Sequence, residues 1–128
     1  MKTIILFTLA VITAQAAPTP AFFAALHQVE TGSALGAIKG DNGKALGPLQ
    51  IHRAYHADSR VGGDYARCSD LEYSKKVVTA YLKRYAPAAA WESGDVSTLA
   101  RIHNGGPRGH LKPATLKYSQ KVLRVLKK

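Results

Sequence analysis

The chain of 128 residues contains one cysteine, Cys68, so no disulfide bond can form within it. In many small domains, disulfides stabilise the fold by about 2–4 kcal/mol through restriction of the unfolded chain. Here, packing of apolar side chains must supply the stability, and a chain of this length can bury a modest core. We expect Cys68 to be a buried or half-buried thiol, with pairing to a second chain as the less favoured alternative.

The N-terminal residues have the pattern of a secretory signal. Lys2 precedes an apolar run over residues 4–13, and Ala14-Gln15-Ala16 is a small-x-small cleavage site. The run is too short to span a bilayer as a stable helix, so no transmembrane segment is predicted. We predict a signal peptide at 1–16, one domain at 17–128 and an extracellular protein. An apolar core helix is the alternative interpretation.

The charge of the chain is strongly positive. Lysine and arginine total 18 against 8 acidic residues, and the formal net charge is +10. For a secreted protein this balance favours binding to anionic surfaces such as bacterial walls or membranes. No nucleic-acid-binding motif accompanies the charge, so nucleic acid is not a predicted partner. No paired-cysteine pattern typical of structural zinc is present either.

Periodicity and turn residues predict several helices and one small hairpin. Thr19 and Pro20 can begin the first helix, and Gly32 can end it. The remaining predicted elements are a hairpin from 37–39 and 44–46 around the turn 40–43, a helix from Ser69 to Pro87, a loop over 88–94, a helix from Asp95 to Gly105, and a helix over 113–125. This order predicts an α+β fold, mostly helical, with the hairpin segregated from the helices.

Two carboxyl groups lie in contrasting predicted settings. Glu30 follows Leu26 by four residues and Phe23 by seven, so it shares their apolar helix face, where desolvation favours a protonated carboxyl. Asp41 lies in a Gly-Asp-Asn-Gly turn, where we expect it to be solvated and ionised. Hydrolysis of glycosidic bonds uses such a pair. The spacing alone leaves open that Glu30 is a polar residue near a helix end and that Asp41 is an ordinary turn residue.

Histidine and tyrosine side chains are further candidates for a site. His52 and His56 lie four residues apart, but no His-Glu-x-x-His pattern is present, and no metal is predicted. His103 and Asn104 end a predicted helix, where they could cap it or face a substrate. Tyr81 lies on an apolar helix stripe, so core packing is its default role, although its hydroxyl could reach a cleft.

Motifs along most of the chain resemble the invertebrate-type lysozymes, also called the destabilase family. The resemblance covers roughly residues 26–122. It rests on VETG (29–32), GDNG (40–43), GPLQIHRAYHAD (47–58), YLKRY (81–85) and ARIHNGGPRG (100–109), with Thr115 and Tyr118 after them. The motif over 100–109 is long and specific, whereas the first motif alone would be weak.

The resemblance implies a lysozyme-like fold and a muramidase that hydrolyses the β-1,4 bond between N-acetylmuramic acid and N-acetylglucosamine in peptidoglycan. It implies that Glu30 donates the proton, that Asp41 is the nucleophile or stabilising carboxylate, and that no cofactor is needed. It leaves open whether chitin oligosaccharides are also accepted. From the resemblance and the motifs that carry it, we predict nine substrate-binding residues. They are Gln50, His52, Arg53, Tyr55, His56, Asp58, Tyr81, His103 and Asn104.

The sequence departs from the family in two respects. The disulfide framework usual in the family is missing, which bears on stability rather than on the chemistry. His56 stands where relatives carry an aromatic residue, and imidazole stacks less well than tryptophan on a sugar ring. The open alternatives are a lytic transglycosylase and a non-enzymatic cationic antimicrobial protein. No serine or lysine can be assigned from the sequence to the isopeptidase activity of some relatives.

Overall fold

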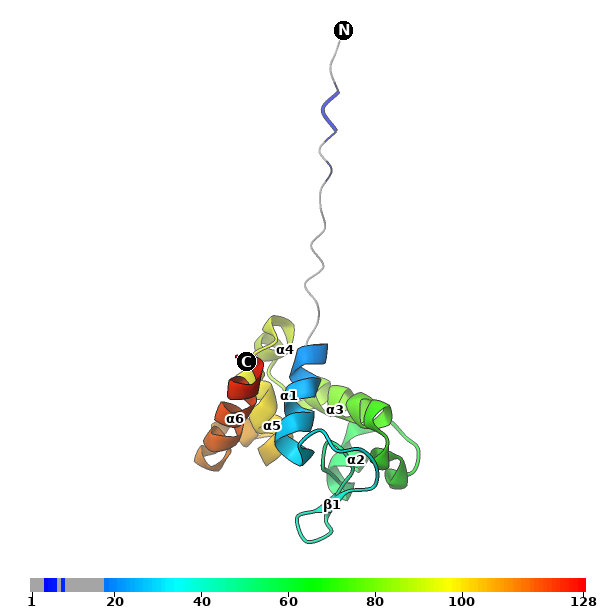
Figure 1. Ribbon diagram of the computed structural model, residues 1–128. Helices are drawn as coiled ribbons and strands as arrows, with labels where there is room; N and C mark the ends of the chain where they lie inside the picture. The colour runs from blue at the N-terminus through cyan, green and yellow to red at the C-terminus, as the bar shows by residue number, and fades with distance from the viewer. Residues whose placement is uncertain (1–3, 7, 9–17) are drawn as a thin grey trace.

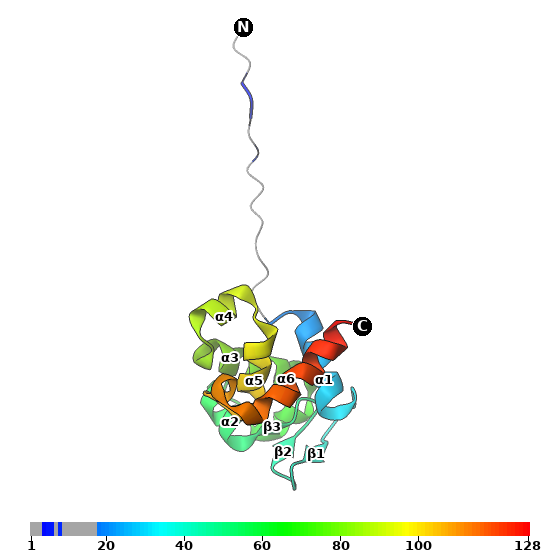
Figure 2. The ribbon, with the colours of Figure 1, turned by 90° about the vertical axis from the view of Figure 1, so that its left-hand side faces the viewer.

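The computed structural model describes residues 4–6, 8 and 18–128 of the chain. Most of the predicted signal peptide, including its cleavage site at 14–16, lies outside the described residues. Six α-helices and three two-residue strands follow one another in the order α1 (Pro20–Thr31), β1 (Lys39–Gly40), β2 (Ala45–Leu46), β3 (Ile51–His52), α2 (Arg53–Ser59), α3 (Leu71–Tyr85), α4 (Ala88–Ser93), α5 (Val96–Gly105) and α6 (Leu116–Leu126). Short 3-10 turns join them at Tyr65–Ser69, Gly109–Leu111 and Pro113–Thr115. The predicted α+β class is confirmed: helices dominate, and the small sheet lies at the opposite end of the domain from α4 (Figures 1 and 2).

The first helix, α1, begins and ends where the sequence predicts. The hydroxyl of Thr19 accepts a hydrogen bond from the backbone N–H of Phe22 at 3.2 Å, and Pro20 is the first helical residue. Gly32 ends the helix with a left-handed φ of 63°, and its N–H donates to the carbonyl of Gln28. Both ends are therefore fixed by local sequence. This fixes the position of Glu30 in the last turn.

The predicted hairpin is present, and a third strand extends it. In the antiparallel pair β1–β2, Gly40 lies opposite Ala45, and in the pair β2–β3, Leu46 lies opposite Ile51. The third strand was not predicted, because two residues are too few to show an alternating pattern. The hydroxyl of Thr31 donates to the carbonyl of Pro48 at 3.0 Å, which ties the end of α1 to the segment that enters β3.

Two segments for which no helix was predicted are helical. Residues 53–59 form α2, and the loop predicted at 88–94 contains α4, which ends at Gly94 with φ 67°. Three alanines after Pro87 explain α4, because alanine has the highest helix propensity. The length of α4, six residues, is too short for its periodicity to be recognised.

The starts of two later helices also differ from the prediction. Asp70, not Ser69, caps α3, and its carboxylate accepts from the N–H of Tyr73 at 2.8 Å. Ser69 instead ends the preceding 3-10 turn. The last helix, α6, begins at Leu116, because residues 113–115 form a 3-10 turn rather than its first α-helical turn.

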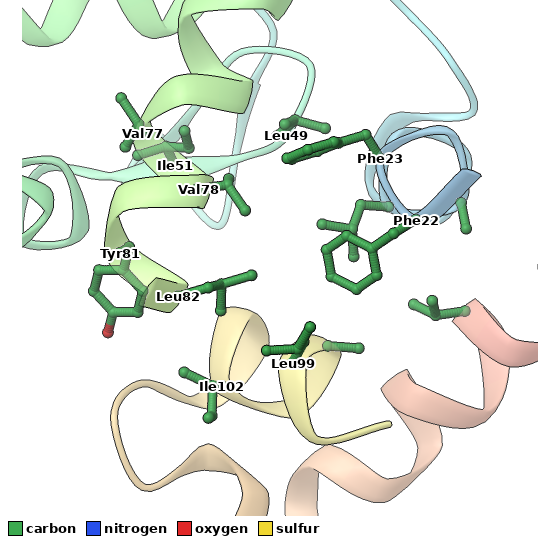
Figure 3. Packing of buried hydrophobic residues seen from close by; sticks show 14 of the residues in the cluster. Phe22, Phe23, Leu49, Ile51, Val77, Val78, Tyr81, Leu82, Leu99 and Ile102 are labelled. Atoms are coloured by element: carbon green, nitrogen blue, oxygen red, sulfur yellow. The ribbon is translucent and has the colours of Figure 1, made fainter. Parts of the chain in front are cut away.

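One apolar core joins α1, the sheet region, α3 and α5 (Figure 3). Its fully buried side chains include Leu26, Leu49, Leu82 and Ile102. Each such side chain contributes about 1.5–3 kcal/mol of transfer free energy. The prediction that Cys68 is buried is confirmed, and burial raises the pKa of its thiol to about 11, so it stays protonated. Within the described part of the chain, no helix is long and apolar enough to cross a membrane.

Candidate active site

A cavity of about 330 Å³ lies between the C-terminal end of α1, the sheet, α2 and α5. It brings together both predicted catalytic residues and five of the nine predicted substrate-binding residues. The lining side chains are those of Glu30, Asp41, Ala45, Gln50, His52, Tyr55, His103 and Asn104. Segments from residue 30 to residue 104 thus meet in one place, which makes this cavity the candidate active site.

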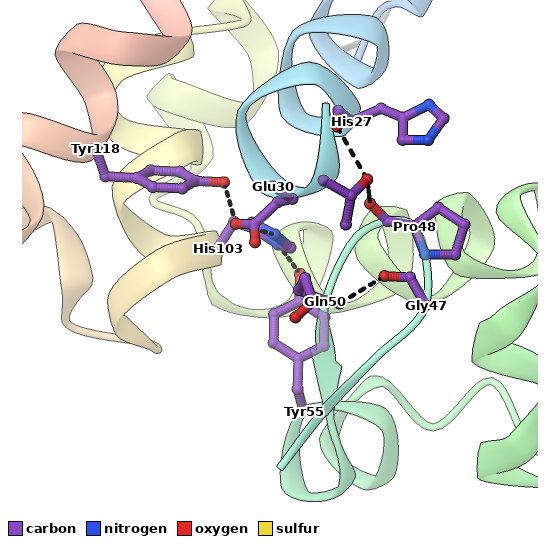
Figure 4. A network of polar contacts seen from close by, with 9 residues as sticks. His27, Glu30, Gly47, Pro48, Gln50, Tyr55, His103 and Tyr118 are labelled. Carbon is purple, nitrogen blue, oxygen red and sulfur yellow. Dashed lines mark hydrogen bonds and ion pairs between the residues drawn. The ribbon is translucent and has the colours of Figure 1, made fainter. Parts of the chain in front are cut away.

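Glu30 is one of the largely enclosed residues of the cavity. Its side chain is 16% exposed, and the hydroxyl of Tyr118 on α6 donates a hydrogen bond to its Oε1 at 2.6 Å (Figure 4). Burial raises the pKa of Glu30, and the hydrogen bond from Tyr118 offsets part of that rise. The carboxyl therefore holds its proton to a higher pH than a solvated glutamate, as a general acid requires.

His103 on α5 lies beside Glu30 and is uncharged at neutral pH. Its side chain is 3% exposed, and burial lowers its pKa to about 4. The ring nitrogen Nδ1 forms a hydrogen bond with the hydroxyl of Tyr55 at 2.9 Å. Nε2 lies 3.7 Å from Oε1 of Glu30, and because the imidazole is neutral, this contact is not an ion pair.

Asp41 occupies the opposite, open side of the cavity. Its side chain is 60% exposed and lies in the turn between β1 and β2, with a left-handed φ of 51°. Its Oδ2 lies 3.2 Å from Nε2 of His52, the last residue of β3. The site thus contains one enclosed and one hydrated carboxyl group. Among the residues whose positions are described, no three His, Cys, Asp or Glu side chains converge as a metal site would require.

Gln50 lines the cavity, but its amide nitrogen is already engaged. Its Nε2 donates to the carbonyl of Ile38 at 3.1 Å and to that of Gly47 at 2.9 Å. A Cβ atom at Gly40 would lie 1.9 Å from Oε1 of Gln50, so a larger residue there would displace the Gln50 amide. Gln50 therefore shapes the sheet that carries Asp41.

Two of the remaining predicted binding residues point away from the cavity. The guanidinium of Arg53 lies 4.5 Å from the centre of the Tyr65 ring, and Nε2 of His56 forms a hydrogen bond with the hydroxyl of Tyr73 at 2.8 Å. Adjacent residues of a helix point about 100° apart, so His56 faces Tyr73 while Tyr55 faces the cavity. The helical conformation of α2 thus separates side chains that are neighbours in the sequence.

Tyr81 and Asp58 do not line the cavity either. Tyr81 is 3% exposed and stacks on Tyr55, with ring centres 3.6 Å apart and planes inclined by 12°. Asp58 lies exposed on α2. Tyr81 therefore supports Tyr55 from behind, while Asp58 stays in solvent.

Tyr118, a polar neighbour of Glu30, was not predicted as a site residue. It lies 88 positions from Glu30 in the sequence and sits on a basic amphipathic helix. Its place in the family resemblance was the only signal that pointed to it. No local pattern in the sequence shows that α6 packs against α1 (Figure 2).

The fold and this site define the lysozyme-like class. The crystal structure of Tapes japonica lysozyme matches with a TM-score of 0.68 and 29% sequence identity, over 81% of this chain and 87% of that one. The helices and the small sheet agree with that class.

Sequence relatives identify the family. A lysozyme from Meretrix lusoria is 34% identical over 101 residues, which cover 77% of this chain and 82% of the relative. A lysozyme from Ostrea edulis is 38% identical over 81 residues, 60% of this chain, and the matched segment spans only 58% of the relative's length. No protein-family model matches the chain. The chain belongs to the invertebrate-type lysozyme family.

Proposed function

We propose that the protein is a secreted muramidase that hydrolyses the β-1,4 glycosidic bond between N-acetylmuramic acid and N-acetylglucosamine in peptidoglycan. One observation carries the proposal: the half-buried Glu30 and the exposed Asp41 line the same cavity. The relatives named lysozyme support the same activity. The signal-like pattern at residues 1–16 supports secretion.

In the proposed reaction, Glu30 protonates the oxygen of the leaving sugar. Its raised pKa keeps the proton available near neutral pH. Asp41 stabilises or attacks the positively charged sugar as the bond breaks. Glu30, now ionised, then activates the water that completes hydrolysis. No step requires a cofactor.

Binding of the sugar chain is proposed for the cavity-lining residues that project from the sheet, α2 and α5. His52 and Asn104 are exposed, and the neutral His103 holds Tyr55 by a hydrogen bond. Tyr81 acts through its stacking on Tyr55. In this proposal, the exposed His52 and Asn104 make polar contacts at the rim. Tyr55, held by His103 and Tyr81, forms a rigid aromatic wall inside.

Attraction to anionic bacterial walls is the second part of the proposal. Exposed basic residues of α6 include Lys117, Lys121 and Arg124. Such charges raise the rate of encounter with an anionic surface, and salt screens the attraction. A purely cationic mode of killing would not need the cavity, so the placement of Glu30 and Asp41 favours the enzymatic proposal.

The test is digestion of purified peptidoglycan by protein beginning at residue 17, followed by mass spectrometry of the released fragments. Reducing sugar ends support the hydrolase, and anhydro ends would instead support a transglycosylase. Glu30→Gln should fold normally and lower the rate on the order of 10³-fold, because a general acid contributes about 10²–10⁴-fold. Glu92→Gln is the matched control, since Glu92 is exposed on α4 and lies outside the cavity. Full activity of Glu30→Gln would overturn the proposal.

A further inference from the structure

A second cavity, about 530 Å³ in volume, adjoins the candidate active site at β2 and β3. Ala45 and His52 line both cavities, so the two share a wall. We call the second cavity the hairpin groove and define it by six of its lining residues: Lys39, Lys44, Leu46, Arg53, Asp64 and Tyr65. The function proposed above makes no use of it.

The hairpin groove carries an excess of positive charge, with three basic side chains against one carboxylate among its described lining residues. Lys39, Lys44 and Arg53 are exposed, and within the described residues none of the three forms an ion pair. Asp64 is the only acid that lines the groove, and its carboxylate accepts a hydrogen bond from the backbone N–H of Ala66 at 3.1 Å. The groove therefore presents three cationic groups to a ligand and a single carboxylate that is already engaged.

The floor of the hairpin groove is apolar and held in place. It includes Ala45, which is 2% exposed, and the ring of Tyr65. The hydroxyl of Tyr65 donates to the carbonyl of Ile51 at 2.6 Å, so its polar end is not free for a ligand. Arg53 lies over the same ring at 4.5 Å from its centre, which orients the guanidinium by a cation–π contact. A ligand with carboxylates and small apolar groups fits this surface better than a neutral sugar does.

We propose that the hairpin groove binds the anionic peptide that peptidoglycan carries on its muramic acid residues. This inference rests on the proposed function. Such peptides combine carboxylates, which Lys39, Lys44 and Arg53 attract, with alanine methyl groups, which suit the apolar floor. The shared wall places the groove next to the cavity in which the muramyl sugar is cleaved, so one wall polymer can occupy both. The groove then selects peptide-bearing glycan over bare glycan.

The test compares two forms of one substrate: peptidoglycan freed of wall teichoic acid, and the same glycan after an amidase has removed its peptides. The double variant Lys39→Gln/Lys44→Gln should raise KM for the peptide-bearing glycan about five- to tenfold, with kcat nearly unchanged. This rise corresponds to about 1–1.4 kcal/mol in total, or about 0.5–0.7 kcal/mol for each of two exposed charge contacts. On the glycan without peptides, KM of the same variant should rise less than twofold.

Lys76→Gln/Lys83→Gln is the matched control, because it removes the same charge from exposed positions of α3. If KM rises equally for both double variants, or equally on both substrates, the effect is due to overall charge. Either result would overturn the proposal that the hairpin groove binds the peptide. If the wild-type protein is active and KM is unchanged in Lys39→Gln/Lys44→Gln, the groove proposal is overturned, whereas the proposed muramidase activity is not. Failure of the wild-type protein to cleave either substrate would instead overturn the proposed function on which the groove depends.

A direct measurement complements the kinetics. In the Glu30→Gln variant, addition of a soluble muramyl peptide should shift the amide NMR signals of Gly43, Leu46 and Ala66, which line the hairpin groove and not the candidate active site. The same peptide should shift them at least severalfold less in Lys39→Gln/Lys44→Gln. Shifts confined to residues around Glu30, with none in the groove, would contradict the proposal.

Discussion

The two walls of the candidate active site differ in how far they expose their ionisable side chains to water. The helical wall, from α1, α5 and α6, encloses Glu30 at 16% exposure beside His103 at 3%. The sheet wall leaves Asp41 at 60% and His52 at 47% exposure. Each wall thus contains one carboxyl and one imidazole group, but only the helical wall removes them from water.

This difference explains why pKa shifts of opposite sign occur together on the helical wall. Burial raises the pKa of Glu30 and lowers the pKa of His103 to about 4. Both shifts have one cause, because a desolvated site disfavours the charged form of an acid and of a base alike. The helical wall therefore favours two neutral groups in contact, whereas both groups of the sheet wall remain in contact with water.

Asp41→Asn should remove the contribution of the sheet wall to the reaction. Among the substitutions discussed below, it should have the largest effect. We expect a loss on the order of 10²–10³-fold in kcat, since Asp41 is proposed to stabilise charge that develops in the transition state. Asparagine tolerates the left-handed φ of 51° at this position, so the melting temperature should change little. Kinetics on purified peptidoglycan measures the effect. Near-normal kcat with anhydro products would replace the hydrolase by a transglycosylase.

His103→Gln tests the helical wall through stability. The folded pKa of about 4 lies below the reference value of 6.5, so the unfolded chain binds a proton before the folded protein does. His103 thus contributes stability that is complete above pH 6.5 and is lost as the pH falls towards 4, about 3 kcal/mol in total. Urea unfolding between pH 7 and pH 3 should show a smaller acid-induced loss for His103→Gln.

Glu30→Gln is the internal control for that experiment, because its linkage has the opposite sign. A carboxyl whose pKa is raised in the folded state contributes stability at low pH that is lost as the pH rises through the folded pKa. Glu30→Gln should therefore keep the acid-side loss due to His103. An identical acid-side loss in wild type and His103→Gln would show that His103 is not neutral in the folded protein.

Tyr118→Phe should have the smallest effect. It tests whether the hydroxyl of Tyr118 shifts the pKa of Glu30. The hydroxyl stabilises the ionised carboxylate, so its removal raises the pKa of Glu30 further and moves the alkaline limb of the pH–rate profile to higher pH. We expect the optimal rate to fall about fivefold, the equivalent of ~1 kcal/mol for one hydrogen bond. Tyr85→Phe is the control on α3. A pH profile identical to that of wild type would mean that Tyr118 does not tune Glu30.

Some features of the fold followed from local sequence. Thr19, Pro20 and Gly32 determine the ends of α1, and Asp95 caps α5, because these residues satisfy backbone groups within a few positions. The hairpin followed from its glycine-rich turn. The helices at 53–59 and 88–93 were missed, since short helices gain their stability from tertiary packing rather than from a visible period.

The contrast between Glu30 on an apolar helix face and Asp41 in a turn follows from spacing and local residue types, so it could be predicted without a structure. Three features became visible only in the folded protein: the two carboxyl groups line one cavity, Tyr118 donates to Glu30 across 88 positions, and Arg53 lines the hairpin groove. The physical reason is that burial and distance are properties of how α1, α5, α6 and the sheet pack together. A pKa shifted by desolvation exists only once those elements exclude water.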